Sequence, residues 1–171
     1  DRYALLQDWI AGQFPGSSLT LSPASADASF RRYFRVALSD RSLIVMDAPP
    51  EHEDCRPFVR IAALMSAAGL HVPTVLAQDL ERGFLLLSDL GSTTYLSVLR
   101  EDNADALFRD AIDTLIRWQL ASRPDVLPPY DEALLRRELE LFPDWYIDRH
   151  LGIRLTPMQK TSLQAVFRLI M

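Results

Sequence analysis

Cysteine, glycine and lysine are scarce in this sequence, and each shortage narrows what the protein can be. Only Cys55 is a cysteine, so no disulfide can form within the 171 residues. Six glycines exclude a collagen-like or glycine-rich chain. Of the 18 basic residues only Lys160 is a lysine, so a lysine-dependent mechanism has one candidate. No apolar run approaches the ~20 residues that cross a bilayer. We therefore expect a cytoplasmic protein without a membrane partner.

The charge balance argues against nucleic acid as a partner. The formal net charge is −5 and the isoelectric point is about 5.1. No run of basic residues provides the positive footprint that a phosphate backbone requires. Hydrophobic residues make up 49% of the chain and charged residues 24%, which is ordinary for a globular protein with a core. The sequence does not indicate an oligomeric state.

The first half of the sequence predicts a small sheet. Apolar residues at helical spacing near the start predict a short helix that ends at residues 14–16. Three runs rich in β-branched and aromatic residues then predict strands at residues 19–21, 30–36 and 43–46. A loop of small residues, 22–29, and a tight connection, 39–41, separate them. This order is typical of an antiparallel meander.

A helix and a hairpin complete this part, and helices follow. Apolar residues at helical spacing predict a helix over residues 57–68, and two short strands at 75–77 and 84–87 are joined by a turn at Gly83. Further helices are predicted at residues 94–100, 104–121, 132–142, 144–150 and from 157 onward, with a stiff linker at 123–129. We predict an α+β fold: a lobe with a five-stranded antiparallel sheet over residues 1–90, then the start of a helical lobe over 91–171.

Several strings, in this order, resemble the aminoglycoside phosphotransferase-like kinases, which share the protein-kinase-like fold. They are residues 26–35 (ADASFRRYFR), 44–50 (IVMDAPP), 72–73 (VP), 83–91 (GFLLLSDLG) and 127–142 (LPPYDEALLRRELELF). Within that family the chain is similar to the branch that phosphorylates N-acetylmuramic acid and N-acetylglucosamine at the anomeric hydroxyl in bacterial cell-wall recycling. The resemblance implies ATP and Mg²⁺ as cofactors and an amino sugar as substrate.

The same resemblance implies where the nucleotide binds. The loop between the first two strands would cover the phosphates, because small residues let backbone N–H groups approach them, and the connector after the fifth strand would read adenine through its backbone. The implied cofactor-binding residues are Ala28, Ser29, Phe30, Arg31, Arg32, Met46, Leu87, Ser88, Asp89 and Leu90. Strand alternation points one of the two arginines inward. The alternatives are two solvated arginines, an Asp27 that only forms a turn, and a connector that is an ordinary turn.

The sequence departs from the protein-kinase pattern at the third strand. Met46 stands where such kinases place a lysine, and the helix at 57–68 has no acid to pair with one. A reversed pair between Asp47 and Arg60 could replace that ion pair, although an Asp47 that simply ends a strand beside a solvated Arg60 is the favoured interpretation. The segment 52–55 (HEDC) has the wrong spacing for zinc and predicts a solvated loop.

The complete catalytic pattern of these kinases, His-x-Asp-x-x-x-x-Asn, is absent. The sequence starts at Asp1 and ends at Met171 inside a helical pattern without a stop signal, so we expect a longer natural chain with its catalytic residues beyond Met171. No metal ligands are assigned within these residues, and this piece alone is expected to be inactive.

Three further interpretations stay open. The full-length kinase could act on an aminoglycoside or an amino alcohol instead of an amino sugar, or the chain could belong to a non-catalytic kinase-like scaffold. An all-helical interaction domain would require that the first ~90 residues form no sheet.

The aromatic and acidic segment 142–150 could line a sugar site, but helix packing is favoured, with Trp118 and Trp145 as core candidates.

Overall fold

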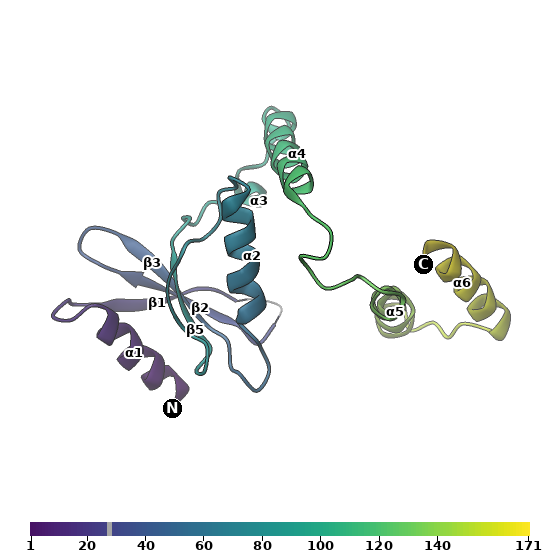
Figure 1. Cartoon of the computed structure of the whole chain (residues 1–171). Helices are drawn as coiled ribbons and strands as arrows, with labels where there is room; N and C mark the ends of the chain where they lie inside the picture. Colours follow the sequence, from purple (N-terminus) through teal and green to yellow (C-terminus); the bar gives the residue numbers. More distant parts are fainter. Residues whose placement is uncertain (27–28) are drawn as a thin grey trace. The chain divides into compact units, whose positions relative to one another are not determined.

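The structure is a computed structural model that describes residues 1–26 and 29–171 (Figure 1). The chain divides into two compact units, Asp1–Ala121 and Ser122–Met171. The proposed lobe boundary between residues 90 and 91 belongs to the two-lobed full-length protein and stays a prediction. Ala28, one of the expected site residues, and Asp27 lie outside the described residues.

A five-stranded antiparallel sheet forms the centre of the first unit, as the sequence predicts. Its strands are β1 (Thr20–Ala26), β2 (Arg32–Ala37), β3 (Ser42–Asp47), β4 (Val75–Asp79) and β5 (Phe84–Ser88). Their order in the sheet is β1-β2-β3-β5-β4, and every neighbouring pair is antiparallel. The predicted meander and the β4–β5 hairpin are both confirmed, and β3 and β5 lie side by side at the centre.

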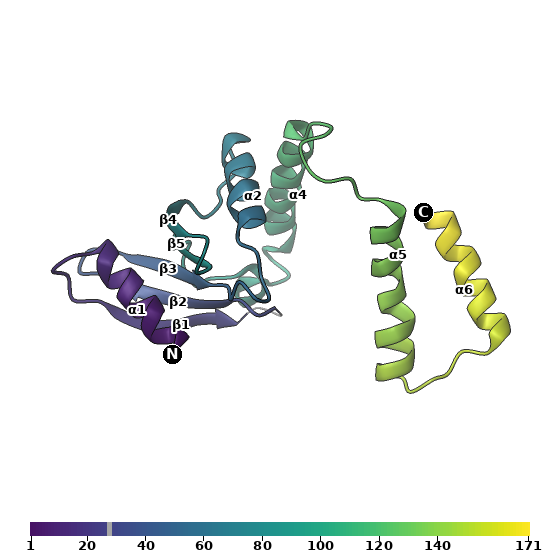
Figure 2. The same cartoon turned by 60° about the horizontal axis from the view of Figure 1, so that its bottom comes forward.

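Helix α1 (Arg2–Gln13) covers one face of the sheet, and Figure 2 shows it lying across the strands. The side chain of Asp1 caps its N-terminus by accepting a hydrogen bond from the backbone N–H of Tyr3. Leu6 and Ile10 are fully buried against sheet residues that alternate along their strands, including Val45 and Phe84. This cluster forms the larger part of the core.

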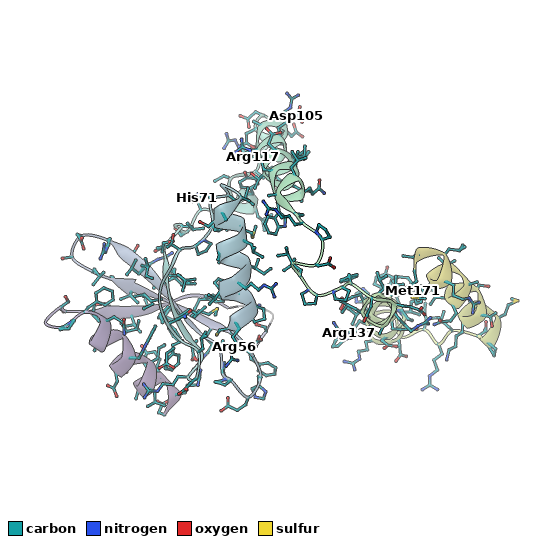
Figure 3. All side chains as sticks on the ribbon, in the orientation of Figure 1. Arg56, His71, Asp105, Arg117, Arg137 and Met171 are labelled. Carbon is teal, nitrogen blue, oxygen red and sulfur yellow. The ribbon has the colours of Figure 1, made fainter. Side chains whose placement is uncertain are left out.

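Helix α2 (Arg56–Ala67) packs near the opposite face of the sheet, and in Figure 3 the label of Arg56 marks its first residue and that of His71 the segment just after its last turn. Phe58 and Val59 of this helix pack against a second buried cluster, formed by Met46, Ala48, Cys55, Leu85 and Leu87. Successive strand residues therefore point alternately toward α1 and toward the α2 side. This alternation decides which side chains reach the site described below.

The expected loop at residues 22–29 is partly strand, and this prediction was wrong. β1 continues through Pro23 to Ala26, with a register shift between Pro23 and Ser25. Proline lacks a backbone N–H, but β1 is an edge strand, where a missing donor is tolerated. The small residues mark a bulged edge strand rather than a free loop.

Gly83 ends the β4–β5 turn at a point where the backbone is crowded. Its φ of 72° lies in the left-handed region. Its carbonyl accepts a hydrogen bond of 2.9 Å from the backbone N–H of Ala48. A Cβ at this position would overlap the carbonyl oxygen of Ala48. The turn therefore requires glycine for both its dihedral angle and its space.

The remaining elements are helical, as predicted, with two differences. They are α3 (Tyr95–Val98), α4 (Ala104–Ala121), α5 (Glu132–Leu141), η1 (Phe142–His150) and α6 (Pro157–Ile170). The predicted helix at 94–100 shortens to four residues. The predicted break before 144–150 is absent, because α5 continues directly into the π-helix η1. Within the described residues, no helix is long and apolar enough to span a membrane.

Trp145 does not belong to a core in this structure, contrary to the prediction. Its side chain is 56% exposed, and the guanidinium of Arg149 lies 4.0 Å from its ring centroid. Trp9 takes the structural role instead, with its ring centroid 5.7 Å from that of Phe84. Trp9 was visible in the sequence only as one apolar residue of the first helix.

Candidate functional site

A cavity of about 450 Å³ opens on the side of the sheet away from α1. Alternate residues of the strands line it: Tyr33 and Arg35 from β2, Ile44 from β3 and Leu87 from β5. Phe58 of α2 closes one wall. The rest of the lining comes from the connector and its neighbours, namely Ala24, Pro73, Ser88, Asp89, Leu90, Gly91, Ser92, Thr93 and Thr94.

The lining combines apolar walls with one polar edge. Ile44, Phe58, Leu87 and Leu90 supply apolar surface, and the connector that follows β5 forms the polar edge with Asp89, Ser92, Thr93 and Thr94. Such a lining suits a flat ring that is sandwiched between apolar side chains and recognised along one edge. The sequence placed this site at the connector, and Leu87, Ser88, Asp89 and Leu90 all line the cavity.

Asp89 is the most strongly held side chain of the cavity. Its carboxylate oxygens accept hydrogen bonds from Arg35 Nε at 2.6 Å and Arg35 Nη2 at 3.2 Å. The hydroxyl of Ser42 at 2.7 Å and the backbone N–H of Gly91 at 2.9 Å also donate to it. The hydrogen bonds from Arg35 hold the pKa of Asp89 well below its usual range, and Asp89 raises the pKa of Arg35. Asp89 is therefore ionised at neutral pH.

Ser88, the last residue of β5, fixes the start of the connector. Its hydroxyl accepts a hydrogen bond of 2.8 Å from the backbone N–H of Thr74, and its own N–H donates to the carbonyl of Thr74 at 2.9 Å. Thr74 directly precedes β4. The connector is thus tied to the sheet at two successive residues, Ser88 and Asp89.

Part of the expected phosphate cover contacts the segment before α2. The ring of Phe30 stacks on that of His52 with centroids 4.3 Å apart, and the backbone N–H of Phe30 donates to Glu53 at 3.2 Å. Ser29 Oγ accepts hydrogen bonds from the backbone N–H and from Nε of Arg31, at 3.2 and 3.1 Å. The two contacts of Phe30 tie the end of the loop to the residues that lead into α2.

Arg31 lies on the same side of the sheet as the cavity. It lines a second cavity of about 450 Å³ together with Glu53, Asp54 and the apolar side of α2. The two cavities share Phe58 and Pro73 in their linings. A ligand in the first cavity could therefore extend toward the guanidinium of Arg31.

Arg32 lies on the opposite side of the sheet, facing α1. Its Nε donates to Asp47 Oδ2 at 3.1 Å, and its Nη2 also contacts that oxygen. Arg2 of α1 donates from Nε to the other carboxylate oxygen at 2.6 Å. Asp47 is fully buried between the two arginines. The structure thus directs Arg32 to a structural ion-pair cluster and away from the cavity.

This cluster takes the place of the less favoured alternative, an ion pair between Asp47 and Arg60. Asp47 does end β3, as expected, but Arg2 and Arg32 hold its carboxylate. Arg2 also donates to the carbonyl of Arg82 at 2.6 Å, which ties α1 to the β4–β5 turn. The contact between Arg2 and Asp47 joins residues far apart in the sequence, so no local spacing could reveal it.

Met46 is fully buried and packs with Ala48, Cys55, Leu85 and Leu87. It does not line the cavity, although its neighbour in that cluster, Leu87, does. Sequence analysis missed Tyr33, Arg35 and Phe58 as lining residues. The signal was present, because strand alternation places residues 31, 33 and 35 on one face once Arg31 is assigned to it.

The described residues supply no catalytic pattern and no metal cluster. Asp54 does follow His52 at the second position, as in the first part of the kinase pattern, but Val59 stands where the asparagine would be. Val59 lies within α2 rather than in a catalytic loop. Within residues 1–26 and 29–171, no three His, Cys, Asp or Glu side chains gather to hold a metal ion.

Comparison with known families defines the class of this chain. The model of the phosphotransferase enzyme family matches residues 20–170. This match spans the sheet, the connector and the helices that follow. The chain belongs to the phosphotransferase enzyme family.

Curated bacterial relatives align with most of this chain. The N-acetylmuramate/N-acetylglucosamine kinase of Pseudomonas aeruginosa (strain PAO1) is 64% identical over 144 residues, which cover 84% of this chain and 42% of the relative. The protein of the same name from Pseudomonas putida (strain KT2440) is 54% identical over 166 residues, covering 97% and 48%. The one from Neisseria meningitidis serogroup B is 40% identical over 168 residues, covering 95% and 50%. The chain therefore spans half or less of the length of these relatives.

Proposed function

We propose that the full-length protein is a cytoplasmic kinase of bacterial cell-wall recycling that transfers the γ-phosphate of MgATP to the anomeric hydroxyl of N-acetylmuramic acid or N-acetylglucosamine. The observation that carries this proposal is the cavity at the connector in a chain of the phosphotransferase enzyme family. The identity of up to 64% with relatives named for this activity supports the choice of sugar.

The cavity would hold the nucleotide base. Its volume of about 450 Å³ is in the range of small-ligand sites, and its apolar walls fit the two faces of a purine. The connector supplies the polar edge. Arg31, on the same side of the sheet, would meet the phosphates with a positive charge in the place of the absent third-strand lysine.

In the proposed reaction, the anomeric oxygen of the sugar forms a bond to the γ-phosphorus. The bond between that phosphorus and its bridging oxygen breaks, ADP leaves, and the hydroxyl proton passes to a base. Mg²⁺ would neutralise charge on the phosphates. The base and the metal ligands are not assigned within residues 1–171, so this chain contributes the binding and positioning of the nucleotide.

Phosphorus NMR of the natural full-length protein with MgATP and one acceptor at a time tests the proposal. We expect N-acetylmuramic acid or N-acetylglucosamine to yield a sugar 1-phosphate signal together with ADP. If phosphate appeared on an aminoglycoside or an amino alcohol while both sugars stayed unchanged, the proposal of an amino-sugar substrate would be wrong. If ATP stayed intact with every acceptor, the proposal of kinase activity would be wrong, and a non-catalytic scaffold would be favoured.

A further inference from the structure

Asp89 joins three segments that are distant in the sequence. Arg35 comes from the middle of β2, Ser42 begins β3, and Asp89 opens the connector after β5. The side chain of Asp89 is only 6% exposed, and that of Arg35 is 30% exposed. By contrast, the Arg100–Asp102 pair of the same unit has side chains 65% and 72% exposed. Arg35 and Asp89 thus form a shielded, two-pronged pair rather than an ordinary surface ion pair.

The same pair also holds the backbone of the connector. The N–H of Gly91 donates to Asp89 Oδ1 at 2.9 Å, and the carbonyl of Gly91 accepts a hydrogen bond from Arg35 Nη2 at 3.3 Å. Gly91 has a φ of 92°, which lies in the left-handed region. Both polar groups of its backbone are therefore engaged, and its unusual dihedral angle is held by two side chains.

We propose that Arg35 and Asp89 are positioning residues that hold the connector in the conformation that reads the nucleotide base. This inference rests on the proposed function and adds a specific role for two residues of the cavity wall. Because Gly91 is engaged by the pair, the edge of the base is left to the neighbouring backbone groups of Asp89 and Leu90. A fixed spacing of those groups distinguishes an amino group on the purine from a carbonyl group.

The conformation of the connector depends on the hydrogen bonds of this pair. Removing either charge leaves its partner at the cavity wall with fewer hydrogen bonds and loosens the two-sided hold on the backbone of Gly91. The connector then samples other conformations, and the base loses the alignment of its edge. Binding of the phosphates and of the sugar does not depend on that alignment.

The test compares Asp89→Asn, Arg35→Gln, Arg35→Lys and the double variant R35Q/D89N in the natural full-length protein. Asparagine keeps the size of the side chain and an acceptor for Gly91, but it loses the charge. We expect D89N and R35Q each to weaken MgATP binding by about tenfold in calorimetric titration and to reduce the preference for MgATP over MgGTP. The KM for the sugar at saturating MgATP should stay unchanged.

Two further results define the role. Since the residues act as a pair, the double variant should bind MgATP no more weakly than either single variant. R35K, which keeps the charge but loses the two-pronged geometry, should give an intermediate affinity. Asp102→Asn is the matched control, because it removes an exposed ion pair of the same unit. It should leave the affinities for MgATP and MgGTP unchanged.

Three outcomes would overturn the inference. One is wild-type affinity and nucleotide preference in D89N and R35Q. Another is an equal loss for MgATP and MgGTP together with a lowered melting temperature, since that indicates only a structural role. The third is a double variant whose loss is the product of the single losses. If the wild-type protein itself binds no MgATP, the proposed function fails first, and that failure is recognised without any variant.

Discussion

At the scale of the residue, the side chains of Arg31 and Arg32 leave the backbone toward opposite sides of the sheet. Arg31 lines a cavity beside α2, whereas Arg32 joins Arg2 on the buried carboxylate of Asp47. Strand alternation produces this division, because adjacent residues point to opposite faces. We therefore expect different roles for the two neighbouring arginines: Arg31 in the proposed nucleotide binding and Arg32 in stability.

We predict different effects for Arg31→Gln and Arg32→Gln in the natural full-length protein. R31Q should raise the KM for ATP by about tenfold, because a charged contact to the phosphates is lost. R32Q should lower the free energy of unfolding by about 1–2 kcal/mol, because buried Asp47 keeps only Arg2, with little change in that KM. Steady-state kinetics and urea unfolding measure the two effects. The reverse pattern would assign the phosphate role to Arg32.

The ionised Asp89 predicts how stability depends on pH. Its pKa is lowered by the hydrogen bonds from Arg35, so the folded pKa lies below the ordinary value of 3.8. Its contribution to stability is therefore fully present above that value and is lost as the pH falls through the folded pKa. The unfolding free energies of the chain and of D89N should differ by about 1 kcal/mol near pH 7 and converge below pH 3.8. A difference that stays constant down to pH 2 would contradict this, and urea unfolding measures it.

At the scale of the element, the β4–β5 turn depends on Gly83. Gly83→Ala should destabilise the chain by about 3–5 kcal/mol, since the methyl group overlaps the carbonyl of Ala48 and the left-handed φ strains alanine. Urea unfolding followed by tryptophan fluorescence measures the loss, because Trp9 packs on Phe84 beside the turn.

Gly69→Ala is the matched control for that variant. Gly69 has a φ of 75° at the end of α2, and nothing lies within 4 Å of a Cβ placed there. The strained dihedral angle alone should cost about 1 kcal/mol. Equal losses in G83A and G69A would show that the contact with Ala48 has relaxed and does not constrain the turn.

Most elements could be predicted from the sequence, because strands and helices there follow clear periods. The three-strand meander, the hairpin and α4 rest on local patterns of apolar residues. The extension of β1 through Pro23 could not be predicted, because it depends on the position of β1 at the sheet edge. The π-helix η1 was not predicted either, because the sequence favoured two separate helices at 132–142 and 144–150, whereas α5 continues directly into η1.

The candidate site was predicted in part. The connector residues Leu87–Leu90 followed from the string of residues 83–91 and line the cavity. The pairing of Arg35 with Asp89 was not predicted, because the two residues lie 54 positions apart in the sequence. Pairings across a sheet depend on register, and register is set by the whole set of strands rather than by neighbouring residues.

At the scale of the whole molecule, the hydrophobic core belongs to one unit. Both buried clusters consist entirely of residues within 1–121. In the second unit, all of whose residues 122–171 the structure describes, Phe167 is the only buried apolar residue. The two units therefore differ in their capacity to fold alone.

We predict that residues 1–121, produced separately, unfold cooperatively with the same urea midpoint as the 171-residue chain. Residues 122–171, produced separately, should show no cooperative transition, because one buried phenylalanine does not form a core. Circular dichroism during urea titration measures both. A lower midpoint for residues 1–121 would show that the second unit stabilises the first.

The bulged first strand also bears on how the protein behaves at high concentration. A free sheet edge offers a row of backbone donors and acceptors that can pair with another molecule and start aggregation. In β1, Pro23 removes one donor and the register shift between Pro23 and Ser25 interrupts the row. The proline and the bulge therefore protect this sheet edge from pairing with another molecule.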